Sequence, residues 1–164
     1  MVADNRNQKA HPTASLEAHL FQRLSEATVA VEWLDADGIR QSWTGPELLS
    51  CVAQYTDRFA ESGLLPGDVL AVISENSPAW LSLDLAAFFY GLTVAPLHPD
   101  ELSGNCDRYL DELEAKLVIV GDRHQAARVL SISSEGSPSK AVVAIQAIDI
   151  DDDRLRIWDC SASG

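Results

Sequence analysis

Basic residues and cysteines are scarce in this sequence, and each shortage argues against a class of protein. Twelve lysines and arginines stand against 25 aspartates and glutamates, which gives a net charge of −13 at pH 7. Such a chain repels phosphate backbones and anionic lipid, so binding to nucleic acid or to a membrane surface is disfavoured. The three cysteines are widely spaced and form no C-x-x-C pair. This argues against a disulfide scaffold or a cysteine zinc site and favours a reducing compartment.

Long apolar runs are also missing. The most apolar stretch, 80–96, is interrupted by Asp84 and Gly91 and is too short to span a bilayer. Residues 1–11 are polar and lack the apolar centre of a signal peptide. We therefore expect a cytoplasmic location and no integral membrane segment.

Motifs for phosphate binding, nucleophilic catalysis and metal binding are absent as well. The sequence contains no G-x-G-x-x-G or G-x-x-x-x-G-K-[ST] loop and no G-x-S-x-G turn, and its four histidines form no H-x-x-x-H pair. The acidic run at 151–153 is expected to be solvated, because an oxygen cage needs ligands from several directions. We assign no catalytic, cofactor-binding or metal-ligating residue.

The 164 residues, 46% of them hydrophobic, suffice for one folded unit with a real core. Residues 1–14 are predicted to be a loose tail and 15–164 a single α/β subdomain, with acidic, irregular chain after 145. Apolar periodicity and turn residues predict the individual elements. The expected strands are 29–34, 39–43, 69–74, 93–97, 116–120 and 141–145, and the expected helices are 16–24, 45–62, 78–90, 102–113 and 123–130.

Strands alternate with helices from Trp43 onward, which is the pattern of βαβ units. Right-handed crossovers then give a parallel sheet covered by helices on both faces. The Asp-Gly turn within 35–38 predicts a β-hairpin ahead of these units. The expected fold class is a three-layer α/β fold whose parallel sheet has a mixed edge.

Two helices carry clear boundary signals. Thr44 and Glu47 form the pattern of a capping box, which predicts a helix start. The helix at 78–90 follows a Ser-Pro start and stops at Gly91. Its surface is apolar nearly all round, so most of it should be buried. Asp84 on this helix is either a buried, hydrogen-bonded carboxylate or a group that faces a partner.

Ligands of open parallel sheets bind beyond the carboxyl ends of the strands, and three such ends can be named. At 74–77 a helix N-terminus could hold an anion, although these residues could equally serve only as its cap. At 96–100, His98 is a base or a ligand on one interpretation and part of a proline-rich rigid turn on the other. The third end, 121–122, is predicted to be a turn. Asn76 and His98 remain as candidate pocket-wall residues.

Four segments occur in a characteristic order: 41–48 (QSWTGPEL), 63–72 (GLLPGDVLAV), 74–80 (SENSPAW) and 86–99 (AAFFYGLTVAPLHP). Together they resemble the N-terminal part of the adenylate-forming, AMP-binding ligases, and most of all the long-chain acyl-CoA synthetases. The resemblance is strongest over 28–125. It implies the N-terminal subdomain of the acyl-CoA synthetase-like fold, incomplete relative to the family.

The resemblance also implies a reaction. Members of the family join a carboxylic acid and ATP into an acyl-adenylate and then transfer the acyl group, usually to coenzyme A, so ATP, Mg and coenzyme A are implied for the full-length enzyme. The segment 133–140 superficially resembles the family's phosphate loop but has a single glycine, too few to turn several backbone N–H groups inward. The resemblance therefore implies a structural portion of a fatty-acid ligase that lacks the catalytic motifs. Its expected partners are the remainder of the enzyme and, through exposed apolar surface, further copies of itself.

Two other interpretations stay open at this point. The chain could be a naturally short, non-catalytic module that binds a protein partner through the apolar helix at 78–90. It could also bind a small ligand at 74–77 in the manner of a flavodoxin-like protein. Whether the chain by itself is an enzyme is left undecided.

Overall fold

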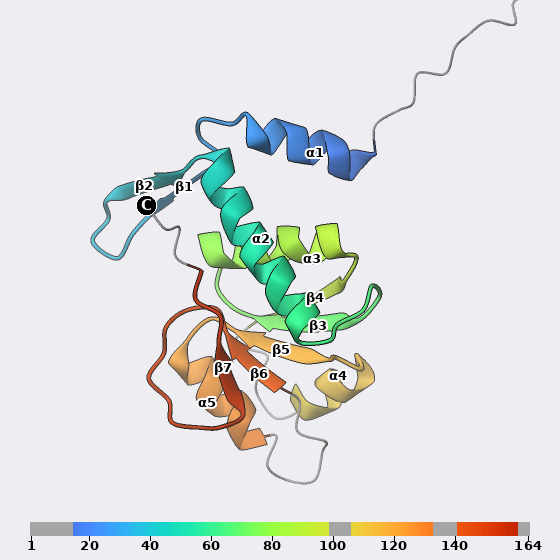
Figure 1. Ribbon diagram of the computed structural model, residues 1–164. Coiled ribbons are helices and arrows are strands. Elements are labelled where there is room, and N and C mark those ends of the chain that lie inside the picture. Colours follow the sequence, from blue (N-terminus) through green and yellow to red (C-terminus); the bar gives the residue numbers. More distant parts are fainter. Residues whose placement is uncertain (1–14, 99–105, 133–140, 161–164) are drawn as a thin grey trace, which may run out of the picture.

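The computed structural model describes residues 15–98, 106–132 and 141–160. The predicted tail at 1–14, the loop at 133–140 and the predicted helix start at 102–105 lie outside these ranges. Figure 1 shows a central sheet with helices above and below it and a small hairpin to one side. Within the described ranges, no helix is long and apolar enough to cross a membrane.

The predicted helices and strands are all present, and their described ends lie within two residues of the predicted ones. One strand, the last, was not predicted, because it is three residues long and lies in an acidic stretch with only one partly buried side chain. The elements in chain order are α1 (Leu16–Ser25), β1 (Val31–Leu34), β2 (Arg40–Trp43), α2 (Gly45–Glu61), β3 (Val69–Ile73), α3 (Pro78–Tyr90), β4 (Thr93–Leu97), α4 (Cys106–Glu112), β5 (Leu117–Val120), α5 (Arg123–Ile132), β6 (Ala141–Ala144) and β7 (Leu155–Ile157).

Five strands form one sheet in the order β4-β3-β5-β6-β7, and every neighbouring pair is parallel. The α/β class with helices on both faces is therefore confirmed. The expected mixed edge is not part of this sheet: the antiparallel pair, β1 with β2, forms a separate two-stranded sheet. The chain crosses from β4 over β3 to β5, so the winding direction reverses beside β3.

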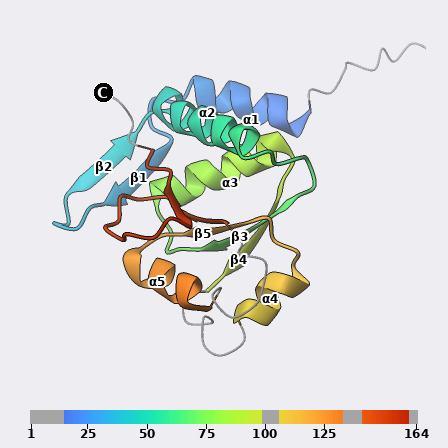
Figure 2. The same cartoon turned by 60° about the horizontal axis from the view of Figure 1, so that its bottom comes forward.

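This reversal distributes the helices over the two faces, as right-handed crossovers require (Figure 2). α2 and α3 pack on one face against Leu70, Ile119 and their neighbours. α4 and α5 pack on the other against Ala71, Val118 and theirs. All four residues of β5 are buried, as expected for a strand covered on both faces.

The predicted helix boundaries are confirmed by hydrogen bonds. Glu47 N donates to Thr44 Oγ1 at 3.3 Å and Thr44 N donates to Glu47 Oε2 at 2.6 Å, so both halves of the capping box are present. α3 begins after Ser77, whose hydroxyl accepts from Trp80 N at 3.1 Å. It ends at Gly91, which adopts a left-handed φ of 85° that glycine tolerates without strain.

α3 is less buried than its composition suggested. Its fully buried residues are Ser82, Leu83, Ala86 and Ala87, while Phe88 is 41% exposed. The expectation that most of this helix is buried is therefore met only in part, because most of its other residues are half-buried. An apolar circumference does not show how much of it the neighbouring elements cover, and here the sheet and α2 cover only part.

The cysteines also differ from expectation. Cys51 on α2 and Cys160 after β7 are joined in a disulfide, with their Cα atoms 5.7 Å apart and 109 residues between them in sequence. The argument against a disulfide scaffold therefore missed this one link. Spacing along the chain gave no sign of the pair, because the contact forms only when the segment after β7 folds back over the sheet toward α2.

Candidate functional site

The carboxyl edge of the sheet brings the sequence-predicted positions together. β3 lies between β4 and β5, in register with both, so the turns that follow these three strands emerge side by side. Gly121, after β5, approaches Ser74, after β3, so closely that a Cβ at Gly121 would collide with the Ser74 side chain. The reversal point of the sheet is therefore tightly closed between β3 and β5.

On the β4 side of β3 the edge is open. A cavity of about 270 Å³ lies there, and Asn76 and His98 both line it, together with Trp80. The two candidate pocket-wall residues, 22 positions apart in sequence, thus share one cavity because Ile73 and Leu97 are partners in the β3–β4 register. This placement leaves their chemical role a prediction.

A second, larger cavity of about 850 Å³ continues from the first, since Asn76 and Trp80 line both. Its far wall is the β1–β2 hairpin, which contributes Trp33 and Leu34. The rings of Trp33 and Trp43 contact each other edge to face at 5.3 Å across the hairpin, which fixes this wall. Sequence reasoning missed the hairpin's part in the site, because nothing local ties residue 33 to residue 76.

The cap interpretation of the turn at 74–77 is confirmed. Ser77 Oγ accepts from Trp80 N, Pro78 has no N–H, and Ser74 Oγ donates to Glu75 O at 2.9 Å. Two of the first three positions of α3 therefore offer no backbone donor to an anion.

The turn at 121–122 is closed in a similar way by a side chain that sequence reasoning did not single out. Gln125, 3% exposed, accepts from Gly121 N at 2.8 Å and from Asp122 N at 3.2 Å through the same Oε1. Asp122 Oδ1 in turn accepts from Gln125 N at 2.7 Å. The prediction of a strand-to-helix turn is confirmed, and its nearest backbone donors are already used.

Two acidic side chains, Asp152 and Asp84, have carboxyl pKa values shifted in opposite directions. Asp152, in the run at 151–153, accepts from Arg154 Nη2 at 2.7 Å and Nε at 3.0 Å. These hydrogen bonds lower the pKa of the Asp152 carboxyl to about 2. Asp84 is half-buried, and that burial raises the pKa of its carboxyl. In the parts of the chain that the structure describes, no group of three His, Cys, Asp or Glu side chains could hold a metal ion.

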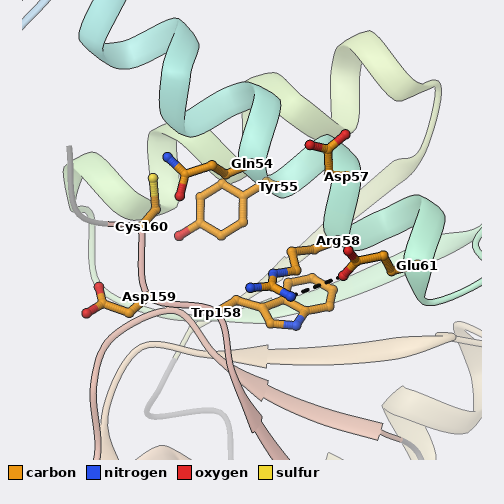
Figure 3. Close-up of a pocket in the computed structure, with 8 residues that line it drawn as sticks. All are labelled: Gln54, Tyr55, Asp57, Arg58, Glu61, Trp158, Asp159 and Cys160. Atoms are coloured by element: carbon orange, nitrogen blue, oxygen red, sulfur yellow. Dashed lines mark hydrogen bonds and ion pairs between the residues drawn. The ribbon is translucent and has the colours of Figure 1, made fainter. Parts of the chain in front are cut away.

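A further pocket, of about 200 Å³, lies on the α2 side and was not predicted (Figure 3). One wall is about two turns of α2, residues 54–61, and the other is the segment that follows β7. Arg58 Nη1 bonds Glu61 Oε2 at 3.1 Å on its rim. Burial, and secondarily the charge of Asp159, raises the pKa of the Tyr55 hydroxyl far above its usual range. The lining residues are Gln54, Tyr55, Asp57, Arg58, Glu61, Trp158, Asp159 and Cys160.

The doubly wound sheet, the hairpin beside it and the four ordered motifs define an α/β subdomain of the adenylate-forming type. Comparison with known families agrees: the profile of the AMP-binding enzymes matches residues 20–162. The chain belongs to the AMP-binding enzyme family and corresponds to an N-terminal portion of its ligases.

Two characterised proteins show similarity over about half of the chain. It is 26% identical over 82 residues to long-chain-fatty-acid–CoA ligase 1 of Cavia porcellus, a match covering 49% of this chain and 12% of that protein. It is 30% identical over 86 residues to the nonribosomal peptide synthetase sidE of Aspergillus fumigatus, covering 52% of this chain and 4% of that one. The matches thus span only a small part of these relatives.

Solved structures share the fold. Acetoacetyl-CoA synthetase from Streptomyces lividans superposes with a TM-score of 0.71 at 20% identity, covering 87% of this chain and 24% of that one. Coronafacic acid ligase from Pectobacterium brasiliense superposes with a TM-score of 0.69 at 13% identity, covering 84% and 27%.

Proposed function

We propose that this chain is the N-terminal structural portion of a long-chain fatty acid–CoA ligase-like enzyme and supplies walls of its site. Residues 15–164 would act in that enzyme as one subdomain, with the remainder of the enzyme chain as its partner. A cytoplasmic location and a place in fatty acid metabolism belong to the same proposal. The family match and the 26% identity to a fatty-acid–CoA ligase support it.

One observation carries the proposal: the backbone donors at the turns of this edge are largely used within the chain. Gln125 Oε1 takes those of Gly121 and Asp122, and Ser77 Oγ takes that of Trp80. Adenylate formation releases pyrophosphate, and the charge that develops needs oriented donors and a cation. Because these donors are already used, the described residues do not fit a bound Mg–ATP, and we assign them no step of the reaction. ATP, Mg and coenzyme A would be bound with the rest of the full-length enzyme.

Within the complete enzyme, we assign Asn76 and His98 a pocket-wall role. Both side chains line the open cavity between β3 and β4, where an amide and an imidazole can hydrogen-bond a ligand. Trp33 and Trp80 extend this wall as apolar surface.

The test is ATP–pyrophosphate exchange by the purified 164-residue chain with a long-chain fatty acid. We expect no exchange, while an intact acyl-CoA synthetase assayed in parallel exchanges readily. Exchange above the no-enzyme background would overturn the proposal. Reading the gene beyond the codon for Gly164 adds a second test, since a Ser/Thr/Gly-rich loop supports the ligase interpretation and an immediate stop codon contradicts it.

A second candidate function is a short, non-catalytic module that binds a protein. An apolar groove of about 370 Å³ between α1, α2 and α3 favours it, with Phe21, Leu49 and Phe89 among its lining residues. Phe21 is 55% exposed. An immediate stop codon combined with specific binding of a protein partner that Phe21→Ser abolishes would favour this module over the ligase portion.

A further inference from the structure

The disulfide between Cys51 and Cys160 is unequally accessible from its two ends. Cys51 lies on the inner side of α2 and has no exposed surface, whereas Cys160 is 7% exposed. The pocket of Figure 3 is lined by Cys160 but not by Cys51. Of the two cysteines, Cys160 is therefore the one that a small molecule entering this pocket can reach.

The lining of this pocket suits a small polar molecule. Its rim carries Gln54, Asp57 and the Arg58–Glu61 ion pair, all on exposed positions of α2. In the wall behind them, Tyr55 Oη is buried and has no hydrogen-bond partner within the described part of the chain. A pocket of about 200 Å³ is too small for a nucleotide triphosphate or a long acyl chain but admits the thiol end of a small peptide or amino-acid thiol.

We propose that Cys160 is a thiol–disulfide exchange site for low-molecular-weight thiols, with Cys51 as its buried partner. An incoming thiolate attacks Cys160 Sγ, the bond to Cys51 Sγ breaks, and Cys51 leaves as a thiolate that takes a proton from solvent. The product is a mixed disulfide on Cys160. A second thiolate attacks the small-molecule sulfur of that mixed disulfide and releases Cys160. The net change converts the protein disulfide and two small thiols into two protein thiols and one small disulfide, and oxidation runs the same steps backwards.

The exchange would control how the segment after β7 is held. Besides the disulfide, this segment is fixed by Trp158 N, which donates to Ala144 O at 2.8 Å, and by the Trp158 ring, 5.9 Å from that of Phe59. These contacts persist when the disulfide opens, but the covalent link between β7 and α2 is lost. We expect amide hydrogens of 155–160 to exchange faster in the reduced chain, with those of β3 and β5 unchanged.

The site can be tested with glutathione, reduced and oxidised, on the folded 164-residue chain carrying Cys106→Ser so that only the pair remains. When the reduced chain is equilibrated with oxidised glutathione, its mass should fall by that of two hydrogen atoms. Proteolysis should then release a peptide pair linked through Cys51 and Cys160. Cys51→Ser should then gain one glutathione on Cys160. Cys160→Ser should remain unmodified while folded and become modified in denaturant. Circular dichroism checks the folding of each variant.

A labelling experiment on the chain in which Cys51 and Cys160 are both intact keeps the proposal testable even if a serine variant fails to fold. In the reduced chain with both cysteines intact, a short pulse of iodoacetamide should label Cys160 at least about tenfold faster than Cys51, because a buried thiol reacts only after local opening. Equal labelling of the two, or faster labelling of Cys51, overturns the assignment of Cys160 as the exchange point. Two free thiols after equilibration with oxidised glutathione overturn the proposal as a whole. Neither result depends on whether the chain belongs to a fatty-acid ligase.

Discussion

The buried side-chain oxygen of Gln125 closes the carboxyl end of β5, and the cost of losing it can be worked out from its contacts. Oε1 accepts from Gly121 N and from Asp122 N. Gly121 N also donates to Ile73 O at 3.0 Å, so the loss of Oε1 leaves chiefly Asp122 N without an acceptor. A partly buried N–H without an acceptor costs about 1–3 kcal/mol.

Two substitutions separate this hydrogen bond from packing. Gln125→Met keeps the length of the side chain and removes the strong acceptor, so we expect the free energy of unfolding to fall by about 1–3 kcal/mol. Gln125→Ala also removes a buried methylene, worth about 0.8 kcal/mol, and should cost about 2–4 kcal/mol in total. Urea unfolding followed by far-UV circular dichroism gives both values if the slope stays the same.

The matched control is Gln54→Ala on the exposed side of α2, which should change the free energy of unfolding by no more than about 0.5 kcal/mol. If Gln125→Met unfolds at the same urea concentration as the wild type, the amide oxygen does not satisfy these donors. The claim that this turn is closed would then be refuted.

Four further predictions concern other parts of the chain. Thr44→Ala removes one half of the capping box and should lower the free energy of unfolding by about 1 kcal/mol in the same urea assay, and an unchanged midpoint would contradict this. Asp152, whose carboxyl pKa is depressed to about 2 by hydrogen bonds from Arg154, should stabilise the fold above its unfolded pKa near 3.8 and lose that contribution as the pH falls toward 2. The melting temperatures of wild type and Asp152→Asn should therefore differ at pH 6 and converge near pH 2, and a difference that persists there would speak against the pair. Exposed apolar surface around Phe21 should cause self-association, so gel filtration should show concentration-dependent oligomers that Phe21→Ser reduces, whereas a wild-type monomer at every concentration would refute the idea. Reducing the disulfide, which closes a loop of 109 residues, should lower the free energy of unfolding by up to about 4.7 kcal/mol from chain entropy alone, and equal stability of the oxidised and reduced chains would show that the link does not restrain the unfolded state.

Elements of this fold with local signals were predictable from sequence. The capping residues Thr44 and Ser77 and the left-handed stop at Gly91 act through atoms three or four residues away, so their effect is readable in a short window. The cavity shared by Asn76 and His98 could be predicted from the sequence for a different reason. Parallel strands end at one edge, so residues that follow two of them are brought together once the strands are neighbours.

Features that depend on distant segments were not predictable in this way. The Cys51–Cys160 link and the pocket beside it join residues about a hundred positions apart, and no periodicity marks them. β7 is too short to show an alternating pattern. Gln125 was overlooked because its role depends on a buried side chain turning back to the strand before it, which composition alone does not reveal.

The two sides of β3 at the carboxyl edge differ in a way that fits the proposed positioning role of this subdomain. On the β5 side, Gly121 lies against Ser74 and its N–H is already bonded to Gln125 Oε1. On the β4 side the edge opens into the cavities lined by Asn76, His98 and the hairpin, whose walls offer side chains and aromatic surface. Orientation of a ligand needs only such walls, whereas stabilising a departing pyrophosphate needs several converging donors. The asymmetry of the edge therefore supports the proposed positioning role, and under that proposal the charge-stabilising groups of the complete enzyme lie on other segments.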